Sequence, residues 1–186
     1  MRTRRNAVGV AVVLAAALAV AGCVQTGPAV IPTSEPSSTP VFASNAAALA
    51  AAKKAYAAYV AASDQVAHGG GLGVQRLAEF DSPSQFKRDS KSFAQMHEDG
   101  HHTVGASAFS NVSLESNEVS NGKAEVVAYI CLQIGGTELL DSSGANVGAS
   151  RPLSVPLEVS FISAEIDSKS LLVDRSDVWS GTNFCS

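Results

Sequence analysis

The sequence predicts an α+β fold, in which N-terminal helices, one of them long, pack on an antiparallel sheet of at least four strands. Residues 45–98 carry helical patterns, and from residue 106 onward apolar and polar residues alternate instead. In residues 123–134 every even position is apolar and the odd positions are mixed, which is typical of a central strand with one face on a core. Helices followed by a run of strands indicate a helix layer on one side of a sheet.

The strongest helix prediction covers residues 45–67. Alanine dominates this stretch, no glycine or proline interrupts it, and Ser44 or Asn45 can cap its first turn. At 1.5 Å per residue the helix is about 33 Å long, which is enough to lie across a sheet. The glycine-rich residues 69–73 then end it, as a C-terminal glycine cap does.

Two further helices are expected before the strands. Residues 74–80 predict a short one, and the third runs from Pro83 to about Glu98. Ser82 suits the N-cap of this third helix, and Pro83 suits its first helical position.

The strands follow in a meander. Residues 106–119 predict the first strand, and a tight turn at residues 120–123 leads into the central one. Residues 139–148 read as a loop or hairpin tip. The last two strands are expected over residues 152–163 and 169–180.

The first 23 residues combine a charged start, an apolar run and a cysteine. Three arginines precede an uncharged run of about 15 residues, shorter than the roughly 20 that a membrane span needs. Val20-Ala21-Gly22-Cys23 follows, and the whole segment resembles the signal peptides of bacterial lipoproteins. The resemblance implies removal of residues 1–22, fatty acyl chains such as palmitate on Cys23, and anchoring to the outer face of the cell membrane. The alternatives are an ordinary secretory signal cut elsewhere and an uncleaved anchor.

Cleavage would leave an acidic chain on a polar tether. Removing three of the thirteen Lys and Arg residues leaves ten against seventeen Asp and Glu, a net charge near −7. This charge argues against nucleic acid and against an anionic lipid surface as electrostatic partners. Residues 23–44 hold four of the seven prolines with Ser and Thr, so they predict a tether, and residues 45–186 predict a single domain.

The cysteines predict one disulfide. If Cys23 carries lipid, Cys131 and Cys185 remain, and two thiols in an exported protein most often pair. Two free buried thiols are the alternative. The bond would tie the central strand to the C-terminal segment. With no Cys-x-x-Cys pair, the pattern indicates a structural bond and not redox catalysis.

The order of several segments carries a family resemblance. An Ala/Tyr-rich helix (residues 55–67), a strand reading VVAYICLQIGG, an aspartate loop reading LLDSSG, Trp179 and Cys185 follow one another. This order resembles small exported lipoproteins of high-GC Gram-positive bacteria, whose domains are similar to the nuclear-transport-factor-two-like or ketosteroid-isomerase-like cone. The resemblance implies a curved, cone-like sheet around a pocket. That fold usually has six strands, and this sequence shows four strong ones.

Arg175 and Asp177 are the polar candidates for a ligand site in such a pocket. They share the parity of Val173 and Trp179, so they face a pocket if that side of the strand is the inner one. If the other side is inner, they form a surface pair of little energetic weight. The candidate pocket residues are Tyr56, Tyr129, Arg175, Asp177 and Trp179.

No catalytic residue, cofactor or metal site is predicted. The glycines of residues 69–73 fit no phosphate-binding fingerprint, and the spacing of His97, Asp99, His101 and His102 fits no metal site. We therefore expect a non-catalytic domain that binds a small ligand or an envelope protein. The alternatives are a pocket enzyme of the isomerase or dehydratase type, which requires a buried titratable group, and a structural accessory of a cell-envelope complex.

Overall fold

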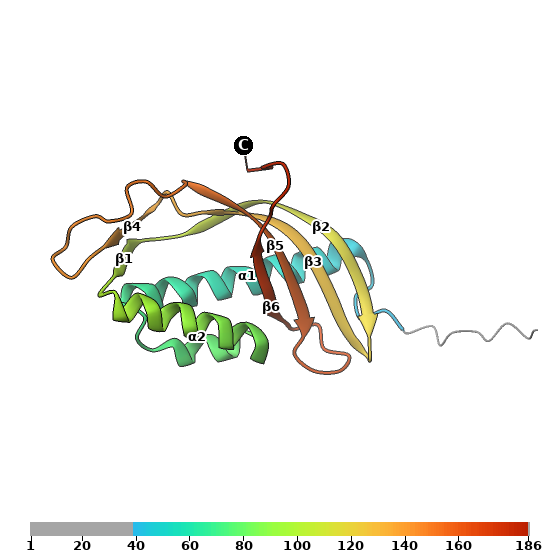
Figure 1. The fold of residues 1–186 in the computed structure, drawn as a ribbon. Coiled ribbons are helices and arrows are strands. Elements are labelled where there is room, and N and C mark those ends of the chain that lie inside the picture. The colour runs from blue at the N-terminus through green and yellow to red at the C-terminus, as the bar shows by residue number, and fades with distance from the viewer. Residues whose placement is uncertain (1–38, 186) are drawn as a thin grey trace, which may run out of the picture. The chain divides into compact units, whose positions relative to one another are not determined.

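A computed structural model describes residues 39–185 and shows the predicted α+β fold (Figure 1). The leader, Cys23 and most of the tether lie outside the described residues. The helices of the described part are α1 (Asn45–His68), the 3-10 helix η1 (Val74–Glu79) and α2 (Pro83–Glu98). Its strands are β1 (His102–Gly105), β2 (Ala108–Ser120), β3 (Lys123–Gln133), β4 (Thr137–Leu140), β5 (Ser154–Ser163) and β6 (Leu171–Val178).

Helix α1 begins and ends where its sequence predicts. The Ser44 hydroxyl accepts a hydrogen bond from the Ala47 N–H at 3.2 Å, and Gly69 caps the C-terminal end. The side chains of Ala48, Ala52 and Tyr56 form a buried stripe at intervals of four residues, which is one face of a helix. The two alanines let the helix lie close to the sheet.

Four antiparallel strands in the order β2-β3-β5-β6 form the main sheet, with β3 in the interior as predicted. We call the face that α1 covers the inner face and the opposite one the outer face. The inner face carries the apolar even positions of β3, of which Ala124, Val126, Ala128 and Ile130 are fully buried. Two register shifts within β2 mark bulges, which bend a strand, and Figure 1 shows the sheet arching over α1.

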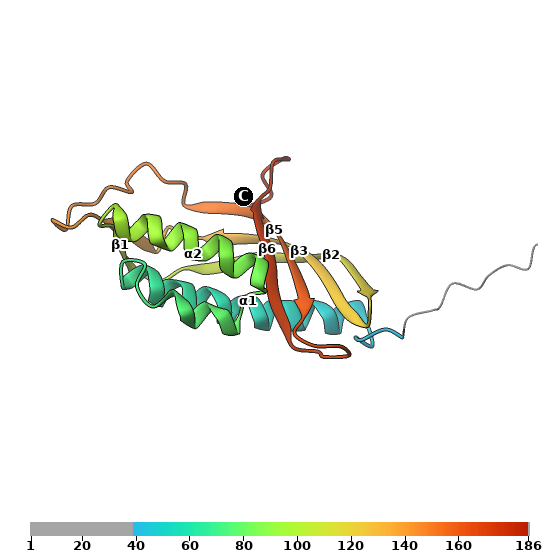
Figure 2. The same cartoon turned by 60° about the horizontal axis from the view of Figure 1, so that its bottom comes forward.

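Both α1 and α2 lie on the inner side of the main sheet (Figures 1 and 2). Helix α1 contacts β2, β3 and β6, and α2 contacts β6 and η1. None of the helices in residues 39–185 is long and apolar enough to span a membrane.

A second, two-stranded sheet was not predicted. Strand β1 pairs antiparallel with β4, placing His102 opposite Leu140 and Gly105 opposite Thr137. The loop expected from residue 139 therefore begins later, because Leu139 and Leu140 belong to β4. With four residues each, these strands are too short to show a clear alternation in the sequence.

The boundary between tether and domain also lies earlier than predicted. Phe42, inside the segment predicted as tether, is only 4% exposed and belongs to the main core cluster. Its neighbour Val41 packs against the same cluster. The folded domain therefore includes these two residues, which the composition had assigned to the tether.

The predicted disulfide is confirmed. The sulfur atoms of Cys131 and Cys185 are 2.13 Å apart, and the two Cα atoms are 5.4 Å apart. Cys131 lies at an odd position of β3, and its side chain is fully buried. The bond holds the segment after β6 against the outer face of the sheet.

Candidate functional site

The five candidate pocket residues do not line one pocket. Strand β6 contains a bulge, which places Val173 opposite Phe161 but Arg175 opposite Ser160. Because the extra residue reverses the alternation, Val173 points inward whereas Arg175 and Asp177 point outward. These two side chains form an exposed ion pair on the outer face. The prediction that Arg175 and Asp177 line an inner pocket was therefore wrong.

Trp179 and Tyr129 also lie on the outer face. Their ring centroids are 5.0 Å apart in an edge-to-face arrangement, and the Phe184 ring lies 5.7 Å from the Tyr129 ring. The pocket prediction for Tyr129 and Trp179 was therefore wrong as well, and they form a surface cluster with the C-terminal segment.

Tyr56 alone of the five lies in the interior. Its ring is 1% exposed and packs 5.1 Å from Phe109 and 5.8 Å from Tyr59, measured between centroids. Burial raises the pKa of the Tyr56 hydroxyl, and the negative charge of Asp89 adds to this shift. The buried Tyr56 hydroxyl and the Asp89 carboxylate therefore lie near each other in the space between α1, α2 and β6.

That space holds a pair of aspartates, Asp81 and Asp89. The segment Phe80–Ser82 lies along the edge of β6: the Val173 N–H donates to the Phe80 carbonyl and the Ser82 N–H donates to the Val173 carbonyl, both at 2.8 Å. Asp81 is thereby bridged to Val173, an inward-facing residue, and its side chain is only 3% exposed. Asp81 also borders a surface hollow of about 600 Å³, together with Ser84, Lys123 and Asp174 among others.

Asp89 is held by hydrogen bonds from two helices. The Tyr59 hydroxyl of α1 donates to its Oδ2 atom at 2.9 Å, and Gln85 Nε2 of α2 donates to its Oδ1 atom at 2.9 Å. Hydrogen bonds to a charged acceptor are among the stronger ones in proteins. Asp89 is thus a fixed negative charge beside Asp81.

Neither carboxyl oxygen of Asp81 has a conventional donor among the described residues. Burial raises the pKa of this carboxyl to about 8, and the charge of Asp89 and a hydrogen bond with Asp89 contribute to the shift. Asp81 therefore keeps its proton at neutral pH. Chemically, the pair is a buried acid whose proton is exchangeable near pH 8, next to two tyrosines.

The sequence carried a signal for one of the two aspartates. Asp89 lies three residues after Phe86 and four before Phe93, on the apolar side of α2, where a charged residue is unusual. Asp81 had no comparable signal, because its burial depends on the pairing of Phe80–Ser82 with a strand about 90 residues later.

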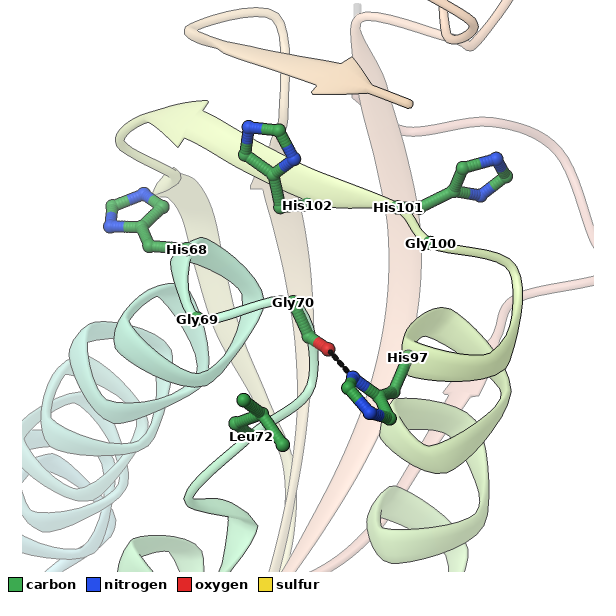
Figure 3. Close-up of a pocket in the computed structure, with 8 residues that line it drawn as sticks. All are labelled: His68, Gly69, Gly70, Leu72, His97, Gly100, His101 and His102. Atoms are coloured by element: carbon green, nitrogen blue, oxygen red, sulfur yellow. Dashed lines mark hydrogen bonds between the residues drawn. The ribbon is translucent and has the colours of Figure 1, made fainter. Parts of the chain in front are cut away.

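Four histidines surround a second hollow, of about 360 Å³, at the opposite end of α2 (Figure 3). His97 Nδ1 lies 3.1 Å from the Gly70 carbonyl oxygen, and His68 Nε2 lies 2.7 Å from that of Gly105. Figure 3 shows His68 and His101 on opposite sides of the hollow. Within residues 39–185, no three His, Cys, Asp or Glu side chains are arranged to hold a metal ion.

Comparison with known proteins finds a structural likeness but no relative by sequence. No protein-family model matches the chain, and no curated protein matches it. The fold is similar to a crystal structure of the intermembrane space region of the chloroplast protein ARC6, with a TM-score of 0.49 and 11% identity, covering 72% of this chain and 97% of that one.

Proposed function

We propose that this chain is an exported lipoprotein, anchored to the outer face of the cell membrane through Cys23, whose domain binds an envelope protein or a small ligand without catalysis. The observation that carries the proposal is the disulfide between Cys131 and Cys185. Disulfides form and persist in oxidising compartments outside the cytosol. This agrees with the lipoprotein-like leader that precedes Cys23, and with a cone-like domain of the kind found in small exported lipoproteins.

The anchor is tested by replacing Cys23 with alanine. The variant is expected to lose its acyl chains and to move from the membrane fraction to the soluble or secreted fraction, because two or more chains make a stable anchor. Fractionation with radiolabelled palmitate measures both effects. Cys185→Ala is the matched control, since it also replaces one cysteine with alanine but should stay labelled and membrane-bound. Retention of Cys23→Ala in the membrane would refute the anchor.

The acid pair favours a second candidate function, a pocket enzyme of the isomerase or dehydratase type. Such enzymes transfer protons with a buried carboxyl whose pKa lies near the working pH, and Asp81 beside Asp89 and Tyr59 meets that description. Asp81 would act as the general acid or base, and Asp89 would keep its proton available. A ligand would have to reach it from the hollow that Asp81 borders.

A native mass spectrum of the protein purified from its own type of host separates the two functions. An extra mass, beyond that of the acyl chains, that is present in the wild type and lost in Asp81→Asn supports a ligand at the acid pair, and conversion of that ligand by the wild type supports the enzyme. An extra mass that both proteins keep favours a ligand site elsewhere on the domain, and no extra mass in either favours an envelope protein as the partner.

A further inference from the structure

The outer face of the main sheet brings like charges together across strands. The register places Glu118 of β2 directly opposite Glu125 of β3, and Glu158 of β5 directly opposite Asp177 of β6. Like charges in directly opposed positions destabilise a strand pair. Among residues 39–185 the ion pairs are Arg88 and Arg175 with Asp177, so the three glutamates have no basic partner there.

An aromatic cluster adjoins these carboxylates. Tyr129 is directly opposite Glu158, and its ring contacts those of Trp179 and Phe184. Desolvation raises the pKa of the Tyr129 hydroxyl, and the negative charges of Glu158 and Glu115 raise it further. Both carboxylates therefore lie close enough to affect the ionisation of this hydroxyl. The disulfide fixes the segment that carries Phe184 over this cluster.

Aromatic rings beside carboxylates are a surface that attracts cations. A guanidinium or ammonium group interacts with the face of a tyrosine or tryptophan ring, and arginine also stacks on it. The same cation relieves the repulsion between opposed carboxylates. A second copy of this chain is a poor occupant, because it would bring its own glutamates against these.

We propose that the outer face of the sheet is a docking surface for a lysine- and arginine-rich segment of an envelope protein. The aromatic cluster of Tyr129, Trp179 and Phe184 receives one basic side chain, and the carboxylates of Glu118, Glu125 and Glu158, which have no basic partner among the described residues, receive others. This inference deepens the proposed binding function by giving the chemistry of the partner. No helix of the described residues covers this face (Figures 1 and 2).

Trp179 provides a direct probe, because it is the only tryptophan of the chain. The mature protein, purified in a non-ionic detergent, is titrated with a short peptide of alternating arginine and serine while its fluorescence is followed. We expect saturable change of Trp179 emission that weakens with added salt, as electrostatic binding does. A glutamate–serine peptide should give none. Binding of the basic peptide without change in Trp179 emission would overturn the proposal.

Charge-matched variants separate this face from the general acidity of the protein. The double variant Glu125→Gln with Glu158→Gln should bind the arginine peptide at least about fivefold more weakly than the wild type. The control double variant, Glu98→Gln with Glu138→Gln, should lose less than about twofold in affinity. An equal loss of peptide affinity in both double variants would overturn the proposal. So would a change of Trp179 emission with choline-headgroup vesicles as large as the change with the arginine peptide. Circular dichroism verifies the fold of each variant. Peptide binding is measured on purified protein and does not depend on attachment to a membrane. A loss of peptide binding can therefore be told apart from a loss of membrane anchoring.

Discussion

Cys185→Ala is expected to lower the free energy of unfolding by about 4 kcal/mol, the value that the chain-entropy account gives for a loop of this length. The bond closes a separation of 54 residues between β3 and the segment after β6. Without it the unfolded chain gains conformations, and the folded chain loses the constraint that holds Phe184 on Tyr129. Denaturation by guanidinium, followed by circular dichroism, measures the change.

Two controls make this result specific to the bond. The wild type with reducing agent should unfold at the same midpoint as Cys185→Ala, because both lack the same cross-link. Cys23→Ala should match the oxidised wild type, since that cysteine is not part of the bond. A Cys185→Ala variant as stable as the wild type would show that the bond contributes nothing to stability.

Asp81→Asn is expected to remove a pH dependence of stability. The pKa of the Asp81 carboxyl rises from 3.8, its ordinary value, to about 8 in the folded protein. Between these values the unfolded chain has released the proton that the folded chain retains. Stability therefore falls as the pH rises through this window, by at most about 1.4 kcal/mol per pH unit, and the loss is complete above the folded pKa.

Asparagine at position 81 has almost the shape of a protonated aspartate but does not titrate. The variant should gain stability over the wild type as the pH is raised from about 4 to about 8, the window set by the two pKa values. Urea denaturation at several pH values measures this difference. Glu165→Gln, which changes an exposed carboxyl between β5 and β6, should follow the wild type. Parallel pH profiles for Asp81→Asn and the wild type would contradict a buried, protonated Asp81.

The sheet and the helices were predictable because their signals are local. The strict alternation in residues 123–134 gave β3 its inner face, and Ser82 with Pro83 gave the start of α2. The disulfide followed from the number of cysteines and the leader. In each case a short stretch of sequence, or a count, was enough to predict the structure.

The candidate site was not predictable in the same way. The outward turn of Arg175 and Asp177 results from a bulge in β6, and one extra residue is enough to reverse the alternation on which the prediction was based. Asp81 is buried only because its segment pairs with the edge of the same strand. Both features depend on contacts between distant parts of the chain.

The burial of Phe42 has a mechanical consequence. In the proposed anchored protein, any pull between membrane and domain passes along the tether and reaches the folded part at Val41 and Phe42, just before α1. Because the Phe42 ring lies in the core and not on a strand edge, the load would act first on side-chain packing, while the hydrogen bonds between strands bear little of it. We therefore expect extraction of the Phe42 side chain from the core to be the first step of unfolding under force.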